Sequence, residues 1–193
     1  GTNLELYREL SQKFSIDIIA SGGVTDMSDV ENLAKMDIYG AILGKAIYTG
    51  NIDLETAIKD EEWDYVTFQQ ASHYSGNLNT YNKAQLDTLT KWAKTNVSNP
   101  DVKIGWHMTW AYQTGSTHSG FANYGKDQMK MYQAIIDTYQ YIYEKYPAIE
   151  GMIPSGTAIQ NLRTSYLGDS LTRDGYHMSY DIGRYTAALT WCS

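Results

Sequence analysis

"NKAQLDTLTKWAKTNVSNPDVKIGWHMTW", residues 82 to 110, contains the helix and the strand from which the architecture of this chain can be worked out. Residues 82–96 carry apolar side chains at helical spacing, and residues 102–110 form a nearly continuous apolar strand. A second apolar strand, "DYVTFQQ" at residues 64–70, comes shortly before this helix. Two strands that are apolar throughout and are joined by a helix predict a parallel sheet covered on both faces.

The same alternation of strands and helices continues on both sides of this stretch. Ser28, with Glu31 three positions later, has the spacing of a capping box that opens a helix. Further strands are predicted at 16–21, 38–47 and 149–156, and further helices at 4–14, 28–35, 53–60, 126–146, 157–167 and 179–191. The predicted fold class is therefore α/β, with a parallel sheet flanked by helices.

Composition and charge limit the classes of function. The 193 residues are 42% hydrophobic and 19% charged, which is typical of a globular domain. The net charge of −7 argues against a nucleic acid partner, because such a partner requires clustered Lys and Arg. No apolar run is long enough to span a bilayer, so no membrane partner is expected.

Cysteine and histidine residues show no metal-site pattern. Cys192 is the only cysteine, so neither an internal disulfide nor a cysteine-based metal site is predicted. His73, His107 and His118 stand on separate segments without ligand spacing, and we interpret them as polar or core residues. We expect neither a metal nor another cofactor.

The two ends of the sequence lack ordinary start and stop signals. The sequence begins at Gly1, with neither an initiator Met nor a signal-peptide pattern. It stops at "TAALTWCS", inside the last predicted helix. We interpret the sequence as a fragment or as a hybrid of two folds.

Two glycine-rich turns follow the first two predicted strands. "ASGGV" (20–24) and "LGKAIYTG" (43–50) each stand between a strand and a helix, where backbone N–H groups and the helix dipole attract anions. Lys45 adds a positive charge to the second turn. The alternative is that glycine is only the residue that a tight turn tolerates.

The whole segment 1–58, which includes "IDIIASGGVTDMSDVENLAKMDIYGAILGKAIYTG", resembles the final quarter of a (β/α)8 barrel. That barrel family is the phosphoribosylformimino-5-aminoimidazole carboxamide ribotide isomerase of histidine biosynthesis, which implies a cytoplasmic location for this part. The resemblance also implies one of the family's phosphate-binding sites at Gly22, Gly23, Gly44 and Lys45.

The aspartates of this segment do not reproduce the acid–base pair of the isomerase. The resemblance implies that the two catalytic aspartates belong to earlier barrel strands, and Asp17, Asp26 and Asp29 stand at other positions. We therefore expect a segment that binds phosphate without isomerase turnover.

Residues 61–193 resemble a different family. "WDYVTFQQASHYSG" (63–76), "WHMTWAYQ" (106–113) and the stretch from "IPSG" to "RDGYHMS" (153–179) are similar to SGNH/GDSL-type hydrolases. This resemblance implies a flavodoxin-like three-layer α/β sandwich and ester hydrolysis through a serine nucleophile, often on acylated sugars. We expect a barrel-derived segment at 1–60, followed by a hydrolase-like domain.

Asp174 and His177 are the candidate catalytic pair. Their spacing lets a carboxylate orient one imidazole nitrogen and leaves the other to accept a proton, and the resemblance makes His177 the base. The same spacing also occurs in a local hydrogen bond at a helix entry. Gln69 or Gln70, just after a strand, either donates an amide N–H to an oxyanion or is simply a polar residue at the strand end.

The letters "GDSL" at 168–171 spell the motif that gives the hydrolase family its name, but their context differs. These enzymes hold the nucleophile between a strand and a helix near the start of the domain. Here "NLRTSYL" (161–167) has a helical pattern, and no apolar strand precedes the motif. We interpret Ser170 as a loop residue. Ser72 and Ser75 are either nucleophiles or loop residues that cap and form hydrogen bonds.

The predicted function is an SGNH-type ester hydrolase for a small acyl ester or an acetylated carbohydrate, with its nucleophile block missing. The alternative is a fragment of the isomerase that keeps only phosphate binding. The expected partners are accordingly a small-molecule ester or a phosphorylated ligand.

Overall fold

The computed structural model describes residues 1–60 and 62–191, which fall into two compact units. The first unit is Gly1–Trp63 with Asn96–Ser98, and the second is Asp64–Thr95 with the chain from Asn99 onward. Each unit has a parallel sheet and a hydrophobic cluster of its own.

The first unit is built around two short parallel strands, β1 (Ile19–Ser21) and β2 (Gly40–Ile42). Its helices are α1 (Leu4–Lys13), α2 (Met27–Ala34), α3 (Lys45–Tyr48) and α4 (Leu54–Lys59). Val30 and Leu33, one turn apart on α2, pack with Ala20 of β1 in the buried cluster. This helical spacing of apolar side chains is what holds α2 against the strands.

Two predictions for the first unit were wrong. The capping residue of α2 is Asp26 and not Ser28, since the Asp26 carboxylate accepts two backbone N–H groups at 3.0 and 3.3 Å. An ionised oxygen is a stronger acceptor than a hydroxyl, so the aspartate defines where the helix begins. The strand predicted at 38–47 ends at Ile42, because Gly44 starts the turn into α3.

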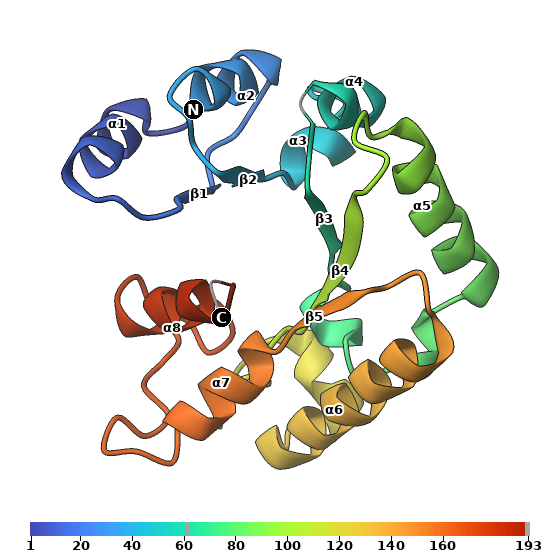
Figure 1. The fold of residues 1–193 in the computed structure, drawn as a ribbon. Helices are drawn as coiled ribbons and strands as arrows, with labels where there is room; N and C mark the ends of the chain where they lie inside the picture. Colours follow the sequence, from blue (N-terminus) through green and yellow to red (C-terminus); the bar gives the residue numbers. More distant parts are fainter. Residues whose placement is uncertain (61, 192–193) are drawn as a thin grey trace. The chain divides into compact units, whose positions relative to one another are not determined.

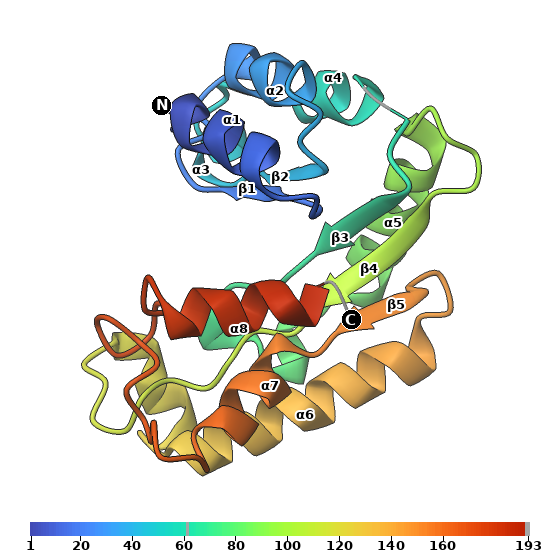
Figure 2. The same ribbon diagram turned by 60° about the vertical axis from the view of Figure 1, so that its left-hand side comes forward.

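The second unit has a three-stranded parallel sheet in the order β3-β4-β5. Its strands are β3 (Tyr65–Phe68), β4 (Lys103–His107) and β5 (Gly151–Ile153). Its α-helices are α5 (Lys83–Asn96), α6 (Gln128–Lys145), α7 (Ser155–Leu162) and α8 (Ile182–Trp191), and short 3-10 turns lie at Ser72–Tyr74, Leu78–Thr80 and Ser119–Tyr124. Figures 1 and 2 show α5 and α6 on one side of this sheet and α8 on the other.

The central strand β4 explains the continuous apolar pattern of the sequence. β4 lies between two strands and is buried from Ile104 to His107. Met131 and Ile135, one turn apart on α6, belong to the buried cluster next to it. The predicted α/β class, with parallel sheets flanked by helices, is confirmed.

The parallel register brings the carboxyl ends of the three strands to one edge of the sheet. The β3–β4 pairing puts Phe68 opposite Trp106, and the β4–β5 pairing puts His107 opposite Ile153. The residues that follow each strand therefore lie side by side. Open α/β sheets bind their ligands at this edge.

The segment after β5 differs from its prediction. The helix predicted at 157–167 begins earlier, at Ser155, and ends at Leu162. Pro154 directly precedes this start, where the N–H that proline lacks would have no partner within the helix. The chain then runs in turns as far as α8, so the letters at 168–171 lie in a loop.

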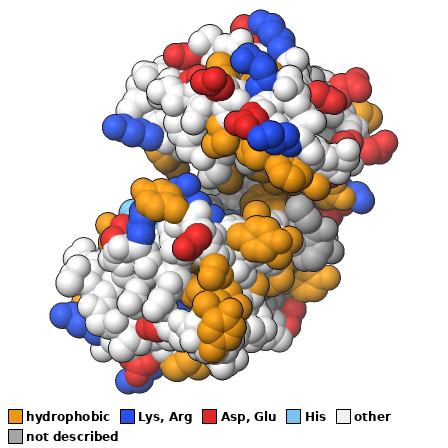
Figure 3. All heavy atoms as spheres, turned by 90° about the vertical axis from the view of Figure 1, so that its left-hand side faces the viewer, with side chains coloured by type: hydrophobic (Ala, Val, Ile, Leu, Met, Phe, Trp, Pro, Cys, Tyr) orange, Lys and Arg blue, Asp and Glu red, His pale blue; other side chains and the backbone are white. Residues whose placement is uncertain are grey.

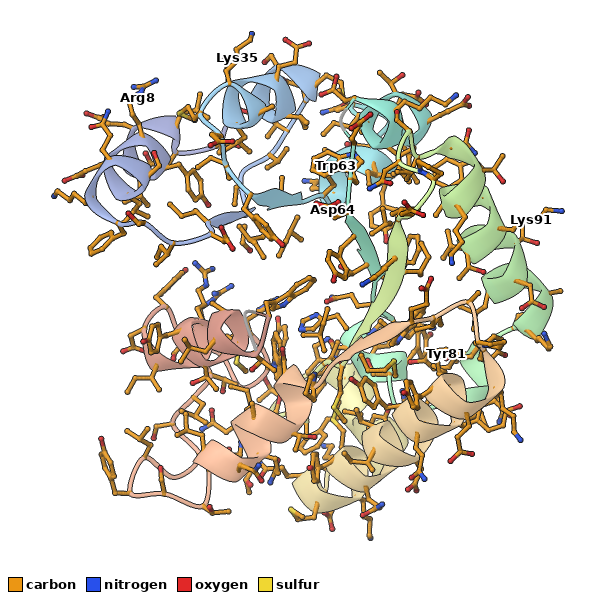
Figure 4. All side chains as sticks on the ribbon, in the orientation of Figure 1. Arg8, Lys35, Trp63, Asp64, Tyr81 and Lys91 are labelled. Atoms are coloured by element: carbon orange, nitrogen blue, oxygen red, sulfur yellow. The ribbon has the colours of Figure 1, made fainter. Side chains whose placement is uncertain are left out.

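Both units carry exposed charged side chains. Arg8 of α1, Lys35 after α2 and Lys91 of α5 are exposed and extend away from their helices in Figure 4. On the face shown in Figure 3, acidic and basic side chains are interspersed and do not gather by sign.

Candidate active site

Asp174 and His177 lie in the loop between α7 and α8, where they form a hydrogen-bonded pair. Nδ1 of His177 is 2.6 Å from Oδ2 of Asp174. The other carboxylate oxygen, Oδ1, accepts the backbone N–H of Tyr176 at 3.2 Å and that of His177 at 2.7 Å. One oxygen therefore fixes the carboxylate to its loop while the other orients the imidazole.

The charge state of the pair follows from these hydrogen bonds. Partial burial by itself raises the pKa of Asp174, but hydrogen bonds from the His177 ring and from two backbone N–H groups lower it to about 2. Asp174 is thus a carboxylate at neutral pH and accepts the proton carried on Nδ1. In the neutral ring Nε2 of His177 then holds the lone pair, and no described residue forms a hydrogen bond with it. The His177 side chain is 52% exposed, so this nitrogen is open to a ligand.

A tight loop, and not a helix entry, produces the Asp-x-x-His spacing. Thr172 and Met178 form an antiparallel bridge across it, and the N–H of Arg173 donates to the His177 carbonyl at 2.9 Å. Gly175, at the turn, has a φ of +91°, in the left-handed region that favours glycine. The loop therefore holds the carboxylate and the imidazole on one short connection.

None of the described serines forms a hydrogen bond with His177. Ser170 is exposed in the loop, with helix α7 and turns before it, so the "GDSL" letters lack the strand that a nucleophile requires. Ser72 Oγ lies 2.8 Å from the hydroxyl of Tyr112. Ser75 is buried and donates to the carbonyl of Ala71 at 3.2 Å.

The two candidate oxyanion donors contact other partners. Gln69 follows β3, and its Oε1 is 2.7 Å from Nδ1 of His107. Nε2 of Gln70 points at Thr80, 3.5 Å from the carbonyl and 3.4 Å from the hydroxyl. Neither glutamine is hydrogen-bonded to the Asp174–His177 pair, so an oxyanion role for either remains a prediction.

A partly buried network that sequence reasoning missed joins the ends of all three strands of the second unit. His107 is the last residue of β4, and its Nε2 lies 2.8 Å from Oγ of Ser155, the first residue of α7. Ser155 is fully buried, and burial lowers the pKa of His107 to about 4. The imidazole is therefore neutral at pH 7. Part of the signal was position, since Gln69 and Ser155 stand near the ends of predicted strands, whereas His107 lies inside the strand predicted at 102–110.

The four predicted phosphate-binding residues lie in the first unit. Gly22 and Gly23 directly follow β1, with φ values of +90° and +80°. Gly44 precedes α3 and Lys45 is its first residue. Because β1 and β2 are parallel neighbours, the two turns lie at the same edge of their sheet. Lys45 is exposed, and no side chain caps α3.

The aspartates of the first unit stabilise local structure. Asp26 caps α2, and a hydrogen bond from Ser28 holds its pKa below the usual range. Asp29 accepts the N–H and the hydroxyl of Thr25 at 2.8 and 2.7 Å, and these bonds lower its pKa. Asp17 is exposed in the segment between α1 and β1.

The match to a family model covers most of the chain. Residues 22–193 match DUF4886, a domain of unknown function. The chain belongs to this family. A crystal structure of a DUF4886 protein from Bacteroides uniformis is 46% identical, with a TM-score of 0.69, over 73% of this chain and 53% of that one. Our DUF4886 chain thus spans about half the length of that relative.

Two further solved structures share its fold. A candidate SGNH hydrolase from Slackia heliotrinireducens is 19% identical, with a TM-score of 0.55, over 88% of this chain and 78% of that one. A candidate GDSL-like lipase from Parabacteroides merdae is 16% identical, with a TM-score of 0.50, over 86% of this chain and 76% of that one. At these identities the likeness shows the fold, and the predicted resemblance to SGNH hydrolases is confirmed at that level.

A short segment of the chain matches a second family of enzymes. Over 59 residues the chain is 56% identical to a phosphoribosyl imidazole-4-carboxamide isomerase from Clostridium botulinum, which is 31% of this chain and 24% of the isomerase. The corresponding enzyme of Brachyspira hyodysenteriae is also 56% identical over 59 residues. The DUF4886 chain therefore spans about a quarter of the length of these isomerases. The predicted resemblance to their family is confirmed.

Three further observations concern membranes, metals and the cysteine. No helix among residues 1–60 and 62–191 has the length and apolar character needed to cross a bilayer. In that same part of the chain, no group of three or more His, Cys, Asp or Glu side chains is placed to hold a metal ion. Cys192 lies outside the described residues.

Proposed function

We propose that this DUF4886 chain carries the base and the orienting carboxylate of an SGNH-type ester hydrolase, acting on acyl esters that include acetylated carbohydrates. The proposal is carried by one observation, the 2.6 Å contact between His177 Nδ1 and the Asp174 carboxylate beside an exposed, unbonded Nε2. The fold that the chain shares with SGNH and GDSL proteins supports the same interpretation.

In this mechanism Asp174 keeps the ring proton of His177 on Nδ1, and Nε2 removes a proton from the nucleophile. No described serine is bonded to His177, and we therefore propose water as the nucleophile within this chain. The water oxygen bonds to the acyl carbon while the carbonyl oxygen becomes an oxyanion. The bond to the alcohol oxygen then breaks, and the proton on Nε2 passes to that oxygen. The products are a carboxylic acid and an alcohol.

Hydrolysis of p-nitrophenyl acetate by the full chain tests this function. His177→Ala is expected to lower the hydrolysis rate, after subtraction of the reaction in buffer alone, by about 100-fold. This is the lower end of what a positioned general base contributes. Asp174→Asn is expected to lower it by about tenfold or more, because an amide no longer selects the Nδ1–H tautomer.

Ser170→Ala is the matched control for this assay, since Ser170 lies in the same loop and is exposed. Its rate is expected to equal that of the wild type. Hydrolysis that continues undiminished in His177→Ala would refute the proposal, and a loss of hydrolysis in Ser170→Ala would replace water with that serine.

We further propose that the first unit binds phosphate at Gly22, Gly23, Gly44 and Lys45. Two observations support this site: the shared sheet edge of the two turns, and the 56% identity of a 59-residue segment to the isomerase. Calorimetric titration with inorganic phosphate is expected to give several-fold weaker binding for Lys45→Ala than for the exposed control Lys35→Ala. Equal affinities for the two variants would contradict the proposal.

A further inference from the structure

Asp169, in the loop before the Asp174–His177 pair, stands at the centre of a polar network. Its Oδ2 accepts the backbone N–H of Thr114 at 2.8 Å, and Gln128 Nε2 donates to its two oxygens at 2.9 and 3.0 Å. Nε of Arg163 lies 2.8 Å from Oδ1 as an ion pair, although its N–H is not aligned for a hydrogen bond. Arg163 also donates to the carbonyl of Ala111 at 2.9 Å.

The ion pair fixes Asp169 in position. The Arg163 side chain is only 4% exposed, and a buried guanidinium without its carboxylate is strongly destabilising. Asp169 therefore stays against Arg163, and its second oxygen stays on the backbone of Thr114. The exposed neighbour Ser170 has no side-chain hydrogen bond among the described residues.

Residues 113–114, which Asp169 fixes, are bonded to the loop that carries Asp174 and His177. Gln113 directly precedes Thr114, and its N–H donates to the carbonyl of Gly175 at 2.8 Å. The Gln113 side chain accepts a hydrogen bond from the hydroxyl of Thr172. A single chain of contacts thus runs from the Asp169 carboxylate to the residue next to Asp174.

Two more contacts reach the same short connection. Trp110 Nε1 donates to the carbonyl of Tyr176 at 2.7 Å. Gly175 packs so closely on Ser116 that an added Cβ would lie 3.1 Å from its hydroxyl. Gly175 and Tyr176 are the two residues between Asp174 and His177, so the segment 110–116 acts on the part of the chain that sets the geometry of the pair.

We infer that Asp169 is a positioning residue for the Asp174–His177 pair: by fixing residues 113–114 it fixes Gly175, and so the alignment of the carboxylate with the imidazole. The inference rests on the proposed function for its catalytic meaning, but its measurement needs no turnover. In this proposal Asp169, and not Ser170, is the residue of the "GDSL" stretch that acts on the catalytic pair.

Alignment matters because the bond from Nδ1 to Oδ2 selects the tautomer of His177. With the proton on Nδ1, Nε2 carries a lone pair and can accept a proton. In the other tautomer Nε2 already carries the proton and cannot act as a base. A displaced carboxylate weakens this selection. Loss of positioning is therefore visible as a shift in the tautomer ratio.

Nitrogen-15 NMR of histidine-labelled full chain measures that ratio at a pH where the ring is neutral, with His177→Ala identifying the signals. The wild type is expected to be mainly in the Nδ1–H form. Asp169→Asn, which keeps the side-chain shape and removes the charge, should move both ring nitrogens toward the Nε2–H form. Asp174→Asn should move them the same way, and Ser170→Ala should leave them unchanged.

Thr172→Val tests the network without disturbing Arg163. It removes the hydroxyl that bonds Gln113 and keeps the side-chain shape, so it should shift the ratio in the same direction, while Thr172→Ser should restore the wild-type values. This variant decides the question if Asp169→Asn does not fold.

Wild-type ring shifts in both Asp169→Asn and Thr172→Val, with only a lower melting temperature, would reduce Asp169 to a structural role and overturn the inference. Shifts as expected without ester hydrolysis would refute the proposed function and leave the positioning role intact. If the His177 ring of the wild type shows no excess of the Nδ1–H form, both the proposed function and the positioning role of Asp169 would be refuted.

Discussion

His107 and His177 belong to the same unit and have similar hydrogen bonds at Nδ1, but their surroundings differ. Nδ1 of His107 is 2.7 Å from an oxygen of Gln69, and Nδ1 of His177 is 2.6 Å from an oxygen of Asp174. Nε2 of His107 is bonded to the fully buried Ser155, whereas that of His177 has no bonded partner among the described residues. The second imidazole is the more exposed of the two, with 52% of its side chain exposed.

The partner at Nδ1 differs in charge as well as in exposure. Gln69 is neutral and offers an imidazolium no opposite charge, and burial lowers the pKa of His107 to about 4. Asp174 is anionic and does stabilise the imidazolium that forms when His177 takes a proton. A serine–histidine contact of 2.8 Å is therefore not sufficient for an active site, because access and a charged partner are also needed.

The largest expected effect comes from acidifying the buried imidazole. The pKa of His107 is about 4 in the folded chain against an ordinary value of 6.5, so its contribution to stability is complete above pH 6.5 and is lost as the pH falls toward 4. The difference in unfolding free energy between wild type and His107→Asn should change by about 3 kcal/mol over this range. Urea unfolding measures it, and hydrogen exchange of the β4 amides assigns it to the second unit. A constant difference would contradict a buried neutral ring.

Ser155→Ala is expected to have a smaller effect, confined to stability. It leaves Nε2 of His107 without a partner in the core, which should cost about 2 kcal/mol. The rate of ester hydrolysis should not change, the opposite of the result expected for His177→Ala. Loss of hydrolysis with full stability in Ser155→Ala would reverse the roles of the two histidines.

The smallest expected effect is at the exposed pair. The pKa of Asp174 is lowered from 3.8 to about 2, so its stabilising contribution is complete above about pH 4 and is lost as the pH falls toward 2. Because the Asp174 side chain is 37% exposed, water screens this contribution, and it should be smaller than that of His107. Comparison of wild type with Asp174→Asn in acid unfolding measures it. If the stability lost on acidification were larger for Asp174 than for His107, the Asp174–His177 pair would not be solvent-exposed.

Predictions from the sequence were accurate for features that depend on residues close together in the chain. Helix α5 was predicted at 82–96 and spans Lys83–Asn96, because the period of its apolar residues is a property of neighbouring positions. The strands were predicted too long, since each ends where pairing with a neighbouring strand ends. Pairing depends on another segment, which local patterns do not describe.

The contact between Asp174 and His177 and the loop position of Ser170 followed from spacing and from the absence of a preceding strand, because both concern residues close together in the chain. Burial and long-range partners depended on the tertiary structure. Gln69 and Ser155 are 38 and 48 residues from His107, and Thr114 is 55 residues from Asp169. Side chains so far apart in sequence meet only when the strands and loops pack. That packing leaves one histidine buried and neutral and the other exposed beside a carboxylate.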